Sequence, residues 1–206
     1  MLFLAGCLLK CSGNTEVTLP FFNNADFTPV WISKSDPAYS SIHTIPAFAF
    51  VDQEGDTITG KALEGKITVA DFFFTICPGI CPRLTKNMGT IQTAFQDDLS
   101  VQLLSHSVTP DIDSIPRLKE YADIHHVLSK QWHLLTGDRN EIYTIARQGY
   151  FADEETGLKK GPDEFLHTEN FILIDQQKRI RGVYNGTNPT EVERLIEDIK
   201  ILKNEI

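Results

Sequence analysis

The stretch Lys66-Ile-Thr-Val-Ala-Asp-Phe-Phe-Phe74, continued by Thr75-Ile-Cys-Pro-Gly-Ile-Cys-Pro82, decides the fold. Its first part is dense in β-branched and aromatic side chains, which is typical of a central strand covered on both faces. From about Arg83 to Phe95, apolar residues then recur at helical spacing. The two cysteines are therefore predicted to lie at a strand-to-helix junction.

Strand and helix patterns alternate on both sides of this junction. The predicted elements are a β-hairpin at 47–59, a strand at 101–105, a helix from Ser114, a strand at 133–135, a helix from Asp138 to about Gly149, a hairpin at 171–184 and a helix from Asn188 to Leu202. Ser, Asp and Asn are favoured N-cap residues, which supports the three helix starts. This order predicts an α/β protein with a thioredoxin-like fold and an added N-terminal β-hairpin.

Length and composition indicate one domain. The chain has 206 residues and 41% hydrophobic content, enough for one substantial core. We expect this domain to span residues 46–206, with residues 1–45 forming a leader and tether. The net charge is -9 and no stretch concentrates Lys and Arg into a basic stripe, so we expect no nucleic-acid partner.

The N-terminus predicts a lipid anchor. Its apolar start is too short to span a bilayer, but Leu4-Ala5-Gly6-Cys7 resembles a bacterial lipoprotein box, in which the cysteine is lipidated. Residues 12–45, rich in Ser, Thr, Asn and Pro, would then form a tether and an irregular entry into the domain. We therefore expect lipidation of Cys7 and a domain held at the bacterial cell membrane, facing the periplasm or the cell exterior.

Cys77 and Cys81 are candidates for metal binding or for redox exchange. Thiolates select Cu(I), Zn and related ions, and a helix N-terminus lowers the pKa of a thiol. The spacing is one residue wider than Cys-x-x-Cys, which favours a metal over thioredoxin-type exchange, while a structural disulfide stays open as an alternative. The prolines and Gly79 shape a loop at a sheet edge, where ligand sites of α/β folds gather.

His167 is the candidate third ligand. Among six histidines it is the one on a loop next to a predicted late strand, at the edge where the cysteines are expected. A lone histidine is more often structural than a ligand, so its position alone does not assign it.

Several motifs resemble those of one family. Phe73-Phe-Thr-Ile-Cys-Pro-Gly-Ile-Cys-Pro82, with proline after each cysteine, resembles the signature of the Sco/SenC copper proteins. Gly65-Lys66, Ser107-Val-Thr-Pro110 and His167-Thr168 before Phe171-Ile-Leu-Ile-Asp175 each fall where that family has a matching element. The resemblance covers roughly residues 46–202.

The resemblance implies a membrane-anchored metallochaperone outside the cytoplasm. It implies copper, as Cu(I) or Cu(II), bound by Cys77, Cys81 and His167, with the reduced dithiol as the binding state. The implied role is assembly of the copper A site of cytochrome c oxidase, with the copper-bearing subunit or another copper acceptor as partner. Three departures each remove an acidic residue of the family pattern; they are Gly79, Thr109 and Leu166.

Two rival functions share the dithiol. A thiol-disulfide oxidoreductase needs Cys77 and Cys81 as a redox-active pair but has no use for His167. A peroxidase or redox sensor would need a Thr or Arg that activates peroxide beside one cysteine, and the motif offers no clear one.

Overall fold

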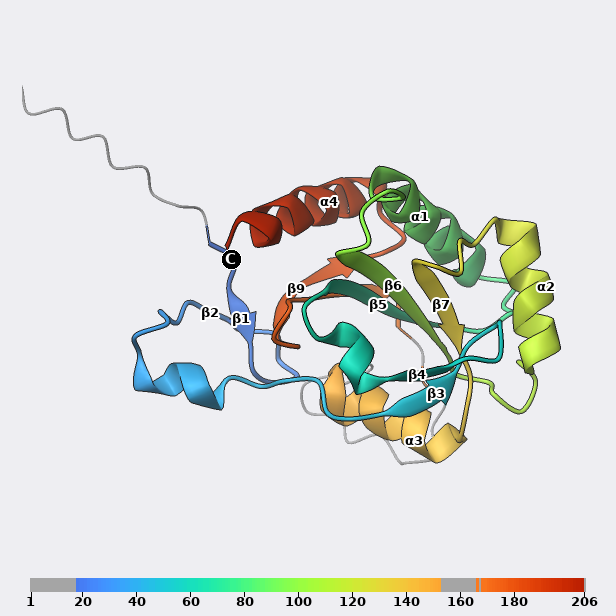
Figure 1. Cartoon of the computed structure of the whole chain (residues 1–206), viewed down its shortest axis with the longest axis horizontal. Coiled ribbons are helices and arrows are strands. Elements are labelled where there is room, and N and C mark those ends of the chain that lie inside the picture. Colours follow the sequence, from blue (N-terminus) through green and yellow to red (C-terminus); the bar gives the residue numbers. More distant parts are fainter. Residues whose placement is uncertain (1–17, 153–165, 167, 206) are drawn as a thin grey trace, which may run out of the picture.

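A five-stranded sheet forms the centre of the molecule in the computed structural model, which describes residues 18–152, 166 and 168–205 (Figure 1). The strand order is β7-β6-β5-β8-β9. Strands β5, β6 and β7 are parallel to one another, and β8 is antiparallel to both of its neighbours, β5 and β9. The strands are β5 (Ile67–Phe73), β6 (Val101–Ser107), β7 (Trp132–Leu135), β8 (Asn170–Ile174) and β9 (Ile180–Asn185). The predicted central strand is β5, and all its residues are buried.

The helices begin close to the predicted positions. They are α1 (Cys81–Ala94), α2 (Ile115–His125), α3 (Arg139–Thr144), which continues into a π-helical turn (Ile145–Gly149), and α4 (Pro189–Asn204). Asp138 caps α3 by accepting a hydrogen bond from the Glu141 N–H at 3.0 Å, and Asn188 caps α4 in the same way. Ser114 stands at the N-cap of α2 but makes no side-chain capping bond. Helix α1 starts at Cys81, before the predicted Arg83.

Two layers cover the sheet (Figure 1). Helices α1, α2 and α4 lie on one face, and their core includes Leu84, Leu118 and Leu195. On the other face lie α3 and the predicted hairpin, formed by β3 (Ala49–Val51) and β4 (Thr57–Thr59). This arrangement confirms the α/β thioredoxin-like fold with the added N-terminal hairpin.

Residues 18–45 pack against the sheet before the hairpin begins. They form β1 (Phe21–Phe22), β2 (Pro29–Val30) and a 3₁₀ turn (Pro37–Ser41). Leu19, Phe21, Ile42 and Ile45 are buried. Arg181 on β9 holds this segment, because its guanidinium donates to the carbonyls of Leu19 and Pro20 at 2.7 and 3.0 Å. This part of the expected tether therefore adds apolar side chains to the core.

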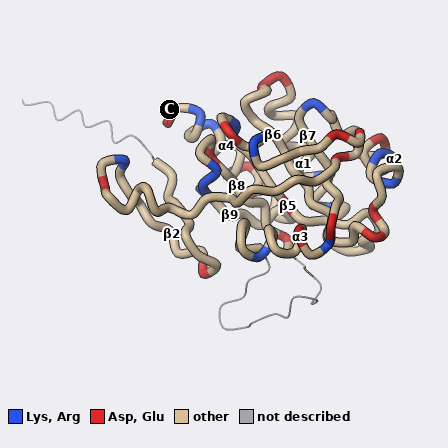
Figure 2. Tube along the Cα trace, turned by 60° about the horizontal axis from the view of Figure 1, so that its bottom comes forward, with Lys and Arg blue, Asp and Glu red and all other residues tan. Residues whose placement is uncertain are grey.

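Within the described residues, no helix is long and apolar enough to cross a membrane. Acidic and basic residues are interspersed along the described trace, as Figure 2 shows.

We predict that the packing of residues 18–45 stabilises the domain substantially. A chain that starts at residue 46 lacks four buried apolar side chains and leaves Arg181 without two of its acceptors. Its free energy of unfolding should fall by on the order of 5 kcal/mol relative to a chain that starts at residue 18. Urea denaturation of both chains measures the difference. Equal stabilities would mean that residues 18–45 are a tether only.

Candidate metal centre

The two cysteines lie where β5 passes into α1. Cys77 is partly buried in the connecting loop, and its N–H donates to the Phe74 carbonyl at 3.3 Å. Cys81 is the first residue of α1 and is 3% exposed. Both are free thiols. The loop therefore presents one accessible sulfur in front of a buried one.

The environments of the two thiols push their pKa values apart. Burial raises the pKa of Cys77, but hydrogen bonds from the Cys81 backbone and thiol and from the backbone of Gly79 and Ile80 outweigh it, so the net pKa is lowered. Two of these backbone donors, Ile80 and Cys81, stand at the N-terminus of α1, where the N–H groups have no partner within the helix. For Cys81, burial raises the pKa to about 12. Cys77 is therefore the thiol that ionises first.

A buried carboxylate, Asp113, holds this loop in place. It accepts hydrogen bonds from the hydroxyls of Thr75 and Ser107, each at 2.6 Å, and from the Thr109 hydroxyl at 3.0 Å. The Thr75 N–H also donates to it at 3.3 Å. Asp113 thus joins the ends of β5 and β6 to the loop before α2. Sequence reasoning missed this residue, because its partner Thr75 is remote in the chain.

A threonine and an arginine do lie at the start of the cysteine loop. The Arg117 Nε–H donates to the Thr75 hydroxyl oxygen at 2.8 Å, and Thr75 lies two residues before Cys77. The Thr75 hydroxyl itself donates to Asp113. Arg117 and Thr75 are therefore part of the hydrogen-bond network that holds the loop. This network explains their positions without a role in activating peroxide.

A second buried carboxyl, Asp71, lies on β5. It is 2% exposed, and burial raises its pKa to about 7 although the Ser105 hydroxyl donates to it. Ser105 in turn accepts a hydrogen bond from the Trp132 indole N–H at 2.9 Å. The charge of Asp71 contributes to the raised pKa of Cys81. Asp71 thus opposes ionisation of the buried thiol.

His167 lies outside the described residues, as do Cys7 and Cys11, but its neighbours in sequence are described. Leu166 is buried, and the Thr168 hydroxyl accepts a hydrogen bond from the Asn170 N–H at 3.2 Å. Because β8 runs antiparallel to β5, it starts at the edge where β5 ends. Among the described residues, no three His, Cys, Asp or Glu side chains form a group that could hold a metal ion.

Gly79 leaves space beside the accessible thiol. A Cβ atom built on Gly79 would lie 3.9 Å from the Cys77 Sγ, which is an ordinary van der Waals contact. An acidic side chain fits there sterically, and its charge would lie close to Cys77. The absence of an acidic side chain at this position therefore helps to keep the pKa of Cys77 low.

The family model for SCO1/SenC matches residues 37–204. The chain belongs to the SCO1/SenC family. This assignment agrees with the motifs around Cys77 and Cys81, and the matched residues include His167.

Solved structures of Sco proteins share the fold. A SCO1/SenC family lipoprotein from Bacillus anthracis is 33% identical, with a TM-score of 0.68 over 78% of this chain and 95% of that one. BsSco, a Sco family cytochrome c oxidase assembly protein with a disulfide switch, is 27% identical, with a TM-score of 0.66 over 78% and 94%. Bradyrhizobium japonicum ScoI with copper bound is 25% identical, with a TM-score of 0.61 over 77% and 99%.

We predict that an acidic residue at position 79 makes Cys77 less reactive. In the Gly79→Asp variant the added charge raises the pKa of the nearby thiol, so less thiolate is present at neutral pH. The rate of alkylation of Cys77 by iodoacetamide at pH 7 should fall about threefold to tenfold. Gly89→Asp is the matched control, because Gly89 lies farther along α1 with open space around its Cβ position. Equal rates in the two variants would contradict the proposed electrostatic effect.

We predict that Asp71 makes the stability of the fold depend on pH. Its raised pKa means that the folded state binds a proton more tightly than the unfolded state, so stability falls as pH rises from about 4 to about 7. The stability of wild type minus that of Asp71→Asn should therefore decrease by roughly 4 kcal/mol over this window and stay level above it. Chemical denaturation at several pH values measures it.

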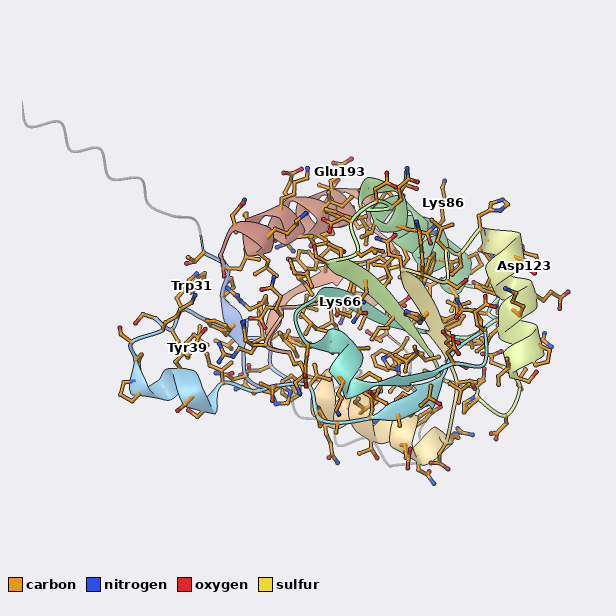
Figure 3. All side chains as sticks on the ribbon, viewed as in Figure 1. Trp31, Tyr39, Lys66, Lys86, Asp123 and Glu193 are labelled. Atoms are coloured by element: carbon orange, nitrogen blue, oxygen red, sulfur yellow. The ribbon has the colours of Figure 1, made fainter. Side chains whose placement is uncertain are left out.

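The control for this experiment is Asp123→Asn, which removes an exposed carboxyl from the outer surface of α2 (Figure 3). Its difference from wild type should vary by no more than about 0.5 kcal/mol over the same pH range. If the stability of wild type minus that of Asp71→Asn also stayed constant over this pH range, Asp71 would be ionised in the folded protein across the whole range.

Proposed function

We propose that this SCO1/SenC protein binds one copper ion through Cys77, Cys81 and His167 and assists assembly of the copper A site of cytochrome c oxidase. It acts from the outer face of the bacterial cell membrane, in the periplasm or cell exterior, with Cys7 as its lipid anchor. The observation that carries this proposal is the pair of free thiols at the N-terminus of α1.

The chemistry of the thiols supports copper binding. Thiolates and imidazole are ligands that suit copper, and a metal ion binds thiols in their deprotonated form. The lowered pKa of Cys77 favours its thiolate form, which is the form that binds the metal. Deprotonation of Cys81 must accompany binding, since its pKa is about 12 in the apoprotein. Copper binding should therefore release protons.

The relatives support the cofactor and the pathway. Bradyrhizobium japonicum ScoI is a copper-bound structure, and BsSco is a cytochrome c oxidase assembly protein. The Bacillus anthracis relative is a lipoprotein, which agrees with an anchor at Cys7. The partner we propose is accordingly the copper-bearing oxidase subunit.

Thiol-disulfide exchange is a second candidate, favoured by the unequal thiols. The Cys77 thiolate would attack a partner disulfide, forming a mixed disulfide and releasing one partner thiolate. Cys81, after losing its proton, would then attack the Cys77 sulfur and release the second partner thiolate. The partner is reduced by two electrons, and Cys77 and Cys81 become a disulfide. An accessible nucleophile in front of a buried resolving thiol suits this order of reaction steps.

We predict that His167→Ala weakens Cu(II) binding more than Cu(I) binding. Two thiolates satisfy Cu(I), whereas Cu(II) needs further nitrogen or oxygen donors. The reduced variant should bind Cu(I) with nearly unchanged stoichiometry and lose at least about tenfold in Cu(II) affinity. Titrations followed by visible absorption measure both. Cys77→Ser and Cys81→Ser should each abolish high-affinity binding of both ions.

His126→Asn is the matched control. His126 is exposed at the end of α2 and adopts a positive φ of 57°, which Asn tolerates. This variant should bind both ions as wild type does. Unchanged Cu(II) affinity and absorption in His167→Ala would exclude the three-ligand site and leave thiol-disulfide exchange as the better function.

A further inference from the structure

A cavity of about 680 Å³ lies between the N-terminal segment, the turn from β8 to β9 and the end of α4. This turn lies at the start of β5, because the Gly65 N–H donates to the Gln176 carbonyl at 3.1 Å. The cysteine loop follows the other end of β5. The cavity is therefore at the opposite edge of the sheet from Cys77 and does not belong to the metal centre.

The charges that line the cavity leave an excess of positive charge. Three cations, Lys34, Arg179 and Arg181, face two carboxylates, Asp175 and Glu205. Both carboxylates pair with Arg181, at 3.3 and 2.7 Å. In a chain with a net charge of -9, a cavity with surplus positive charge favours an anionic ligand.

Arg179 and Lys34 have no carboxylate partner among the described residues. The Arg179 guanidinium stacks 4.0 Å from the centre of the Tyr39 ring and donates once, to the Tyr39 carbonyl at 3.5 Å. Its buried Nε and one Nη atom have no hydrogen-bond partner in the part of the chain described. Within the described ranges, the one hydrogen bond of Lys34 goes to the Glu205 carbonyl, at 3.5 Å. Two cations with unfilled hydrogen-bonding capacity thus border one cavity.

The walls of the cavity are largely apolar. Leu19, Phe21, Trp31 and Leu202 contribute to them, and Trp31 is 65% exposed. Trp31 and Tyr39 both come from the N-terminal segment, as Figure 3 shows. The volume is within the range of sites for small organic ligands and is much larger than a lone oxoanion needs. The occupant should therefore combine an anionic group with an apolar body.

We propose that this cavity binds a phosphate ester with an apolar body, such as the headgroup region of an anionic phospholipid. The phosphate oxygens would accept hydrogen bonds from Lys34 and Arg179, which are the side chains that proteins use for phosphate. The apolar body would pack on Leu19 and Leu202, beside Trp31, a residue type enriched at membrane interfaces. The site stands independently of the copper function.

Short-chain lipids in monomeric form test the proposal on the full chain. Trp31 is the local reporter, since the other of the two tryptophans, Trp132, is 1% exposed. Dihexanoyl phosphatidylglycerol, held below its critical micelle concentration, should protect Trp31 from acrylamide quenching in a saturable manner. The zwitterionic phosphatidylcholine counterpart and inorganic phosphate should each bind at least about tenfold more weakly, because one lacks net charge and the other lacks the apolar body.

Variants connect this binding to the two cations. Lys34→Gln and Arg179→Gln should each weaken phosphatidylglycerol binding by about tenfold. Lys34 is exposed, so its variant keeps the test valid if loss of Arg179 disturbs the packing of Tyr39. Lys200→Gln removes an exposed charge from α4 and should change affinity less than about twofold.

Three results would overturn the proposal. One is the absence of protection of Trp31 by phosphatidylglycerol. Another is equal affinity for the phosphatidylcholine counterpart or for inorganic phosphate. The last is an equal loss of affinity in Lys34→Gln and Lys200→Gln, which would mean that net charge alone governs binding.

Discussion

The geometry of the site depends on the hydrogen bonds that the buried carboxylate of Asp113 accepts. Strands β5 and β6 are parallel, with Phe73 opposite Ser107, so they end at the same edge of the sheet. Asp113 is fully buried there and accepts hydrogen bonds from the hydroxyls of Thr75, just after β5, and of Ser107, the last residue of β6. Neutral donors make its hydrogen bonds, and its counter-ion, the Arg117 guanidinium 4.0 Å away, remains partly exposed, so no second charge is buried with it. The loop that carries Cys77 therefore begins at a fixed point.

Local sequence signals predicted the fold well. The start of α1 and the role of Asp113 were not predicted, and both have physical causes. Asp138 and Asn188 make the capping bonds that their residue types favour. Helix α1 starts earlier than predicted because Ile80 stands at its N-cap without a side-chain bond, so the start carries no capping signal. Asp113 could not be predicted, since no local pattern marks a carboxylate whose donor Thr75 lies 38 residues away.

The N-terminal segment shows the same limit. Residues 18–45 belong to a stretch whose Ser, Thr, Asn and Pro content predicts a tether and an irregular entry into the domain, and in the structure Leu19 and Phe21 are buried. Their position depends on Arg181, which binds the Leu19 carbonyl across 162 residues of sequence. For the site, the sequence identified both cysteines and the strand-to-helix junction. The unequal thiols follow from the burial of Cys81 and from the hydrogen bonds to Cys77, neither of which a sequence records. His167 stays a prediction.

The departures from the family pattern fit this chain. The Thr109 hydroxyl donates to Asp113, whereas a carboxylate at that position would bring two negative charges together. Leu166 packs in an apolar cluster, where a carboxylate would be buried among side chains that cannot compensate it. At Gly79, the missing charge favours the Cys77 thiolate. The pKa of Cys77 is lowered and that of Cys81 is raised, so Cys77 is the first of the two thiols to ionise. Disulfide exchange needs the Cys77 thiolate for its first attack, and copper binding needs the second proton to leave. Disulfide exchange needs the same deprotonation for its second step, so the raised pKa of Cys81 opposes completion of both reactions.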